Sequence, residues 1–295
     1  MRAKLEYFKN NLLKHDNNLY ILNKEDDFVK NFGKQWRDYR DVQIDSLNDF
    51  SISKNFLKDI FFNNLELLNN KTVLEIGGGA GRFTEHIIKK SKLCVSIDLS
   101  AAVFFNVARN NNNLILLKAD FNKLEANKKF DIVFCRGVLQ HTPDPLKSLL
   151  KLYSFVKEDG FVVFDIYKMP KIGYLHPKYF FWRPFIKNLI KYETFENFLK
   201  KNITKLLRLK RKIKKIFFQS NFIADSLVPI WDYKDKLQIS DKKLEDWSIM
   251  DTLDGIYAKY DFPQSYSKIR KTLKKNKINI LNCDVKKNFF ITKIL

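Results

Sequence analysis

The chain alternates between short apolar runs and longer segments in which apolar residues recur every three or four positions. The runs have the length of buried strands and lie at residues 73–76, 95–97, 114–117, 131–135 and 161–166. Helical spacing is found at residues 53–68, 82–90, 100–109, 145–157 and 265–275. Residues 278–283 and 288–292 alternate in polarity, which predicts two closing strands. This strand–helix order predicts an α/β fold with a largely parallel sheet.

Two segments fall outside this repeating pattern. Residues 1–27 have the composition of a charged helix that leads into a short apolar piece at residues 19–22. Residues 168–250 form a long basic segment with helical spacing, inserted after the fifth strand. We therefore expect an N-terminal extension or lid over residues 1–50, a core over 51–167, a basic helical insertion over 168–250, and a C-terminal completion of the core sheet over 251–295.

The richest local motif follows the first apolar run. Gly77, Gly79 and Gly81 alternate directly after this strand, where glycine permits a sharp turn and close approach of a ligand. Asp98 ends the second strand, where a carboxylate can accept both hydroxyls of a ribose. The dinucleotide fingerprint G-x-G-x-x-G is not met, because its third glycine position is Arg82. The unit is therefore expected to hold a nucleoside other than NAD.

Further motifs follow the next two strands. Asp120 and Phe121 come shortly after the third apolar run. The fourth run is followed by residues 136–145, which read Arg-Gly-Val-Leu-Gln-His-Thr-Pro-Asp-Pro. With Glu75 two positions before the first glycine, these motifs resemble class I S-adenosylmethionine-dependent methyltransferases, in particular the type-11 family. The resemblance covers residues 32–165 and roughly 251–295.

The resemblance implies a Rossmann-like, seven-stranded sheet in the order 3-2-1-4-5-7-6, with the last strand antiparallel and helices on both faces. It implies S-adenosyl-L-methionine as cofactor and S-adenosyl-L-homocysteine as product. The residues that it assigns to cofactor binding are Glu75, Gly77, Gly79, Gly81, Asp98, Leu99, Asp120, Phe121 and Arg136. Asp120 would read the adenine amine in such a protein, although an aspartate here can also cap the following turn.

The segment after the fourth strand also narrows the chemistry. Methyltransferases that act on base amines or glutamine amides carry Asn/Asp-Pro-Pro-aromatic here, and this chain does not. Quinone-type O-methyltransferases carry Glu-x-x-Glu-His, but Gly137 and Gln140 replace both glutamates. Because His141 alone is too little for a metal site, we expect no metal. His141 is the candidate general base, with a purely structural donor as the alternative.

The overall charge favours an anionic partner. The chain has 54 Lys and Arg against 33 Asp and Glu, a formal net charge of +21, although a sequence rich in Lys, Asn, Ile and Phe can be basic for no functional reason. The segment from Leu199 to Ile216 has an apolar stripe among many basic residues. It is either an interfacial helix on an anionic membrane or a lid helix that packs on the core. A nucleic-acid partner is less expected, because no RNA-binding module is recognisable.

Acceptor contacts are expected from two regions. Phe32 and Trp36 resemble the N-terminal lid of many methyltransferases, or they form one helix face against the core. Asp251, Asp254 and Tyr260 lie in a segment that lines the substrate side in type-11 relatives.

We therefore expect methyl transfer to an O or N atom, less so C, of a small molecule, glycan or lipid-linked intermediate. An RNA methyltransferase and a non-catalytic cofactor-binding module are the alternatives. The lack of a signal-peptide core and of a membrane-spanning run predicts a cytoplasmic protein, either free or peripheral to a membrane.

Overall fold

The computed structural model describes residues 2–22, 33–34, 38–48 and 50–295. Phe32 and Trp36, the two aromatic residues expected in the lid, lie outside these residues. The chain divides into two compact units. Unit 1 comprises Met1–Arg40, Ile44–Lys168 and Tyr260–Leu295, and unit 2 comprises Asp41–Gln43 and Met169–Lys259. The expected boundary at residues 250/251 falls inside a continuous helix, so unit 2 ends at Lys259.

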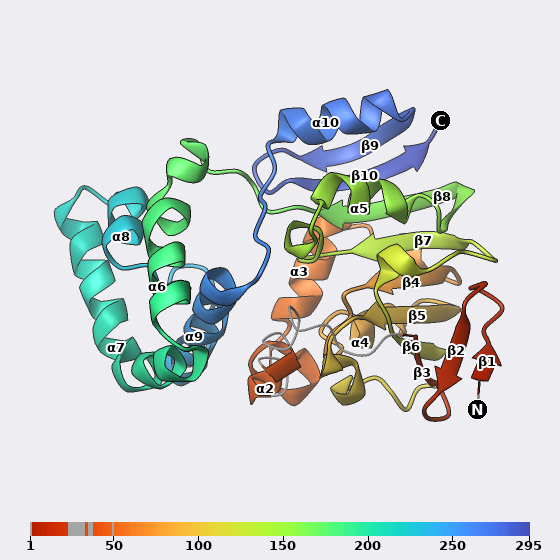
Figure 1. Cartoon of the computed structure of the whole chain (residues 1–295), viewed down its shortest axis with the longest axis horizontal. Helices are drawn as coiled ribbons and strands as arrows, with labels where there is room; N and C mark the ends of the chain where they lie inside the picture. Colours follow the sequence, from red (N-terminus) through yellow and green to blue (C-terminus); the bar gives the residue numbers. More distant parts are fainter. Residues whose placement is uncertain (1, 23–32, 35–37, 49) are drawn as a thin grey trace. The chain divides into compact units, whose positions relative to one another are not determined.

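Unit 1 is built on one mixed sheet (Figure 1). Its strands in chain order are β1 (Arg2–Lys4), β2 (Asn11–Lys14), β3 (Leu19–Ile21), β4 (Thr72–Ile76), β5 (Leu93–Asp98), β6 (Leu114–Lys118), β7 (Phe130–Cys135), β8 (Val156–Asp165), β9 (Ile278–Asp284) and β10 (Phe289–Ile294). The strand order is β1-β2-β3-β6-β5-β4-β7-β8-β10-β9. Strands β6, β5, β4, β7 and β8 are parallel, and β10 runs antiparallel to β8 and β9. The expected order 3-2-1-4-5-7-6 is confirmed, with three additional strands at one edge.

The helical segments of unit 1 are mostly short. They are η2 (Asp45–Leu47), α3 (Ile52–Ile60), η3 (Leu65–Leu68), α4 (Thr84–Ile87), η4 (Ala101–Phe105), η5 (Phe121–Lys123), η6 (Leu139–His141), α5 (Pro145–Leu152) and α10 (Tyr266–Lys275). Alternate residues of the buried strands point to opposite faces, so the sheet has a core on each side. Leu74 and Val133 pack with residues of α5 and α10, whereas Val73 and Phe134 pack with residues of α3 and α4.

The prediction of an N-terminal helix within residues 1–27 is wrong. β1 and β2 pair antiparallel, and β3 joins the core sheet in parallel with β6. Phe8, Leu12 and Leu19 are almost completely buried. The charged residues between 5 and 22 therefore occupy outer positions of strands and turns, and the apolar residues of this part anchor it to the core.

Four expected helices are shorter than their apolar spacing predicts. The helix expected at 145–157 ends at Leu152, and β8 begins at Val156. The helix expected at 53–68 is interrupted after Ile60, because Phe62 and Asn63 adopt positive φ angles of 50° and 63°. The segment after the glycines forms only the four-residue α4, and η4 ends at Phe105. The turn expected at residues 158–160 instead lies within β8. The strand pattern was thus a better guide than the helical one.

Unit 2 is helical. It contains η7 (Gly173–Leu175), the π-helical turn η8 (Lys178–Trp182), α6 (Arg183–Leu189), α7 (Tyr192–Ile216), α8 (Asn221–Leu227) and α9 (Asp241–Tyr257), with the short α2 (Arg40–Gln43) bridging the two units in sequence. Leu199, Ile203 and Leu207 of α7 are buried, and this helix packs on α8 and α9. The first half of the apolar stripe thus serves the interior of unit 2, whereas Leu209 and Ile216 further along α7 are exposed. Among the described residues, no helix combines the length and apolarity needed to span a bilayer.

Candidate functional site

The glycine loop joins β4 to α4 at the carboxyl edge of the parallel strands, and Asp98 holds it in place (Figure 1). The Gly79 N–H donates to Asp98 Oδ2 at 2.8 Å, and the Ser100 N–H and hydroxyl donate to Oδ1 at 2.8 and 2.6 Å. Gly77, Gly79 and Gly81 all have positive φ angles. The carboxylate predicted to bind a ribose therefore lies directly against the loop predicted to surround the cofactor.

Gly78 shows why the loop tolerates no larger residue. A Cβ at this position would lie 1.9 Å from Ser96 Oγ and 3.0 Å from Glu75 Oε2. Glu75, the acidic residue of the first motif, is itself fully buried beneath the loop. The missing side chain thus lets the loop backbone lie on top of two polar groups of the sheet.

The Glu75 carboxyl has two unequal oxygens. Oε2 accepts hydrogen bonds from the hydroxyls of Thr84 and Ser96 at 2.6 and 2.7 Å. Oε1 is buried and has no hydrogen-bond partner among the described residues. Burial raises the pKa of Glu75 to about 7, although the two hydroxyls act in the opposite direction. A buried polar oxygen without a partner, directly under the glycine loop, marks a place where a ligand or an ordered water fits.

Asp120 caps a turn, as the alternative interpretation anticipated. Its Oδ1 accepts the N–H of Asn122 at 2.9 Å, and Lys123 Nζ lies 3.8 Å from Oδ2. A carboxylate oxygen accepts more than one hydrogen bond, so this cap is compatible with a second role. The adjoining Phe121 is buried, and both residues follow β6, next to the strand that ends in Asp98. The adenine contact therefore stays a prediction for these two residues, as does a cofactor contact for Leu99.

His141 lies in η6, just beyond β7. Its Nδ1 is 2.9 Å from the backbone carbonyl of Tyr260, and its ring stands edge-on to Tyr167 with centroids 5.5 Å apart. A carbonyl oxygen can only accept, so Nδ1 carries the proton, and the lone pair of the neutral ring is on Nε2. The predicted base is therefore oriented by the backbone of a residue predicted to contact the acceptor.

The other two acceptor candidates are internal to unit 2. Asp251 Oδ2 accepts from the Tyr233 hydroxyl and from Trp247 Nε1, the latter at 3.2 Å, and Gln43 Nε2 donates to Oδ1 at 3.5 Å. These bonds join α9 to the chain around it and give Asp251 a structural role. Asp254 lies one turn further along α9, where its Oδ1 is buried. An acceptor contact for Asp254 stays a prediction.

Sequence reasoning missed Arg82 and Asp165 at the same edge of the sheet. Asp165 ends β8 as Asp98 ends β5, so the rule that selected Asp98 could have found it. Its Oδ1 accepts the Gly137 N–H at 2.6 Å, and its Oδ2 lies 3.6 Å from Arg136 Nε. Burial raises the pKa of Asp165, whereas Arg136 and the Gly137 N–H oppose that rise.

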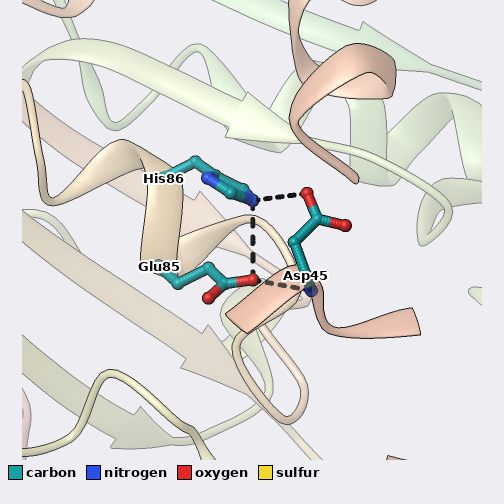
Figure 2. Close-up of side chains that lie close together, drawn as sticks. All are labelled: Asp45, Glu85 and His86. Carbon is teal, nitrogen blue, oxygen red and sulfur yellow. Dashed lines mark hydrogen bonds and ion pairs between the residues drawn. The ribbon is translucent and has the colours of Figure 1, made fainter. Parts of the chain in front are cut away.

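A second missed cluster joins Asp45, Glu85 and His86 (Figure 2). His86 Nε2 lies 3.0 Å from Asp45 Oδ2 and 3.5 Å from Glu85 Oε1, and one potential ligand atom from each residue lies within 4.8 Å of the others. Glu85 also accepts the N–H of Asp45 at 3.0 Å, and Asp45 accepts the N–H groups of Ser53 and Lys54 at 3.0 and 2.8 Å.

These hydrogen bonds explain the Asp45–Glu85–His86 cluster without an ion. The carboxylates bond to backbone N–H groups at η2 and at the start of α3, and the imidazole lies between them. The cluster therefore fastens the segment that precedes α3 to the helix that follows the glycine loop. The expectation that the protein uses no metal stays a prediction.

Comparisons with known proteins agree with this fold and with the location of the glycine loop. A family model described as "Methyltransferase domain" matches residues 52–186. A ubiquinone biosynthesis O-methyltransferase from Hydrogenovibrio crunogenus is 30% identical over 118 residues, which are 38% of this chain and 48% of that protein. A tRNA U34 carboxymethyltransferase from Nautilia profundicola is 30% identical over 104 residues, 33% of this chain and 35% of that protein. The chain thus spans about half the length, or less, of these curated relatives.

Among solved structures, PKMT2 from Rickettsia typhi in complex with AdoHcy is similar with a TM-score of 0.53 and 15% identity, covering 80% of this chain and 52% of that one. This likeness supports the fold. The region matched by the family model begins at α3 and contains every strand from β4 to β8. Residues 52–186 therefore resemble a methyltransferase domain in sequence, and the fold agrees with that resemblance.

Proposed function

We propose that the protein transfers a methyl group from S-adenosyl-L-methionine to an O or N atom, less so C, of a small molecule, glycan or lipid-linked intermediate. The observation that carries this proposal is the contact between Asp98 and the Gly79 N–H, which joins a ribose-type carboxylate to a loop of left-handed glycines. The cofactor would supply a methyl group already activated on a sulfonium. The chain would then need mainly to position an acceptor, and such positioning can contribute up to about 7–11 kcal/mol.

Each described part of the site fits one portion of this cofactor. Asp98 would accept the ribose hydroxyls, Asp120 the adenine amine, and the Phe121 N–H would meet a ring nitrogen. The unpartnered Oε1 of Glu75 lies below the loop on the side proposed for the methionine portion. The backbone at Arg136 would lie at the methionine carboxylate. In this arrangement the cofactor would lie across the carboxyl ends of β6, β5, β4 and β7.

His141 would remove the acceptor proton through Nε2, since its Nδ1 proton is held by the Tyr260 carbonyl. A hydroxyl or ammonium acceptor requires such a base. With an acceptor in hand, His141→Gln is expected to lower kcat at least tenfold and to change the shape of the pH–rate profile. An unchanged profile would assign His141 a structural role.

Binding of S-adenosyl-L-methionine, measured by calorimetry, tests the proposal. The wild type is expected to bind, and Asp98→Ala to lose at least tenfold in affinity. Asp159→Ala is the matched control, because Asp159 is fully exposed and forms an ion pair with Lys293 at the surface. Failure of the wild type to bind at millimolar ligand contradicts the methyltransferase proposal. Binding without transfer to any acceptor would favour the non-catalytic cofactor-binding module.

The acceptor is proposed to be presented at an anionic membrane, mainly through exposed apolar residues that precede α7. In the apolar stripe of α7, Leu199 and Ile203 are buried, and Leu209 and Ile216 are exposed. Before this helix, Leu175, Phe180 and Leu189 are 72, 71 and 69% exposed. Residues 168–192 contain no Asp or Glu. Exposed apolar side chains within a basic segment are typical of interfacial binding. We call the exposed apolar residues of this segment the 172–189 surface.

An RNA substrate is the second candidate, favoured by the net charge and by the relative named as a tRNA-modifying enzyme. The structure weakens the charge argument at α7. Lys210, Arg211 and Lys214 form ion pairs with Asp225, Asp232 and Asp235 of the following segment. Retention of RNA with a steep dependence on salt would support this candidate.

A further inference from the structure

The side chain of Arg136, directly after β7, is only 14% exposed. Its Nε is buried without a hydrogen-bond partner, and the nearest carboxylate oxygen, Asp165 Oδ2, is 3.6 Å away. Three rings surround the guanidinium carbon, with centroids at 5.0 Å for Phe56, 5.0 Å for Phe83 and 5.4 Å for Phe289. The surroundings of this cation are therefore mainly aromatic.

Aromatic rings interact with the cation but do not satisfy its N–H groups. A guanidinium has five N–H donors, and leaving such donors unpaired in the interior is costly. Asp165 meets only part of this need, because its other oxygen accepts the Gly137 N–H. Burial lowers the pKa of Arg136, which reflects the same lack of compensation. An oxyanion from outside the chain would supply the missing acceptors.

A second guanidinium lies against two of the same rings. The guanidinium carbon of Arg82 is 5.2 Å from the Phe56 centroid and 5.0 Å from the Phe83 centroid. Its Nε donates to the Ser53 hydroxyl at 3.0 Å, which positions it at the start of α3. Both arginines therefore lie close enough to the buried Asp165 to stabilise its charge.

The topology places this group beyond the part of the sheet proposed for the nucleoside. The ribose and adenine carboxylates follow β5 and β6, on one side of β4. Asp165 and Phe289 belong to β8 and β10, on the other side. The acceptor, which must approach the methyl group from outside the nucleoside portion, is expected on this second side.

We propose that Arg136, supported by Arg82, binds an oxyanion group of the methyl acceptor, so that the substrate carries a carboxylate or phosphate near the atom to be methylated. This inference rests on the proposed function. The three phenylalanines pack around the Arg136 guanidinium, whose N–H edge is a planar, bidentate donor that suits either anion.

Calorimetry with inorganic phosphate and with benzoate tests this site, using chloride at equal ionic strength as the reference. Titrations are made with and without saturating S-adenosyl-L-homocysteine. The wild type is expected to bind one of the two anions saturably, and which one it binds distinguishes phosphate from carboxylate. Arg136→Gln is expected to weaken this binding at least tenfold. Arg109→Gln, at an exposed arginine paired with Asp16, should leave it unchanged.

Three outcomes overturn the proposal. The first is the absence of saturable anion binding by the wild type, and the second is equal anion binding by Arg136→Gln. The third is that Arg136→Gln loses affinity for S-adenosyl-L-homocysteine but keeps its affinity for methylthioadenosine, which lacks the carboxylate. Arg136 would then bind the cofactor and not the acceptor. If the glutamine variant does not fold, Arg136→Lys decides: weakened anion binding supports the proposal, and unchanged binding overturns it. Failure of the proposed function is seen separately, as no binding of S-adenosyl-L-homocysteine to the wild type.

Discussion

Replacing Glu75 by glutamine tests whether burial of this carboxyl controls the stability of unit 1. The pKa of Glu75 rises from 4.5 to about 7 because the group is buried. The folded protein therefore holds this proton more tightly than the unfolded chain does. Ionisation opposes folding, so the free energy of unfolding falls as the pH rises from about 4.5 to about 7, and the effect is constant above that range. At about 1.36 kcal/mol per pKa unit, the loss is about 3 kcal/mol.

The glutamine variant cannot ionise, so it should not show this loss. Its carbonyl oxygen can accept from Thr84 and Ser96, as Oε2 does, and its amide nitrogen then takes the place of Oε1. No described residue offers an acceptor there, which costs about 1–3 kcal/mol at every pH. We therefore expect the variant to be less stable than the wild type at pH 5 and equal or more stable at pH 8.

Urea unfolding at intervals from pH 5 to pH 8, followed by circular dichroism, measures the difference between the two proteins. Glu125→Gln is the matched control, because Glu125 is exposed, and its stability should follow that of the wild type throughout. Parallel curves for wild type and Glu75→Gln would refute the reasoning. They would mean that Glu75 keeps one protonation state from pH 5 to pH 8, so that its burial makes no pH-dependent contribution to the free energy of unfolding.

Three further perturbations address the other parts of the structure. Asp45→Asn should cost about 1–3 kcal/mol in urea unfolding at pH 7. Burial alone would raise the pKa of Asp45, but hydrogen bonds from His86 and from backbone N–H groups outweigh burial and lower that pKa. The stability that Asp45 contributes is therefore complete above its unfolded pKa of 3.8 and is lost as the pH falls through its folded pKa. Equal acid unfolding of the variant and the wild type would contradict this. Gly78→Ala should reduce affinity for S-adenosyl-L-methionine at least tenfold in calorimetry, because its Cβ would collide with Ser96 Oγ, and normal affinity would show that the loop can shift. Phe180→Ser combined with Leu189→Ser should abolish co-sedimentation with anionic vesicles without changing cofactor binding, whereas unchanged sedimentation would remove the membrane role of the 172–189 surface.

The sequence predicted the strands of the core well, because each buried strand is a short apolar run between polar segments. It predicted helices less well, since apolar spacing continues through residues that do not form a helix. Residues 53–68 keep the helical period, yet positive φ angles at Phe62 and Asn63 end α3 early. The N-terminal strands had no such signal, because three- and four-residue strands carry too few apolar positions to show a period.

The proximity of candidate residues was predictable where a motif follows a strand directly. Glu75, the glycines and Asp98 are brought together by the parallel pairing of β4 and β5. Asp251 and Asp254 belong to α9, and the bonds of Asp251 to Tyr233 and Trp247 depend on packing within unit 2 that no local motif encodes. The pairing of Asp45 with His86 joins residues 41 positions apart, which spacing alone cannot reveal.

The three N-terminal strands have a consequence for colloidal behaviour. Without them β6, with its buried Leu114, Leu116 and Leu117, would form an apolar outer edge of the sheet, and such an edge can recruit strands from other molecules. In the structure β1 takes that outermost position and has only three residues. A very short edge strand is a poor template for intermolecular pairing. The N-terminal hairpin is therefore expected to lower the tendency of the unit 1 sheet to aggregate.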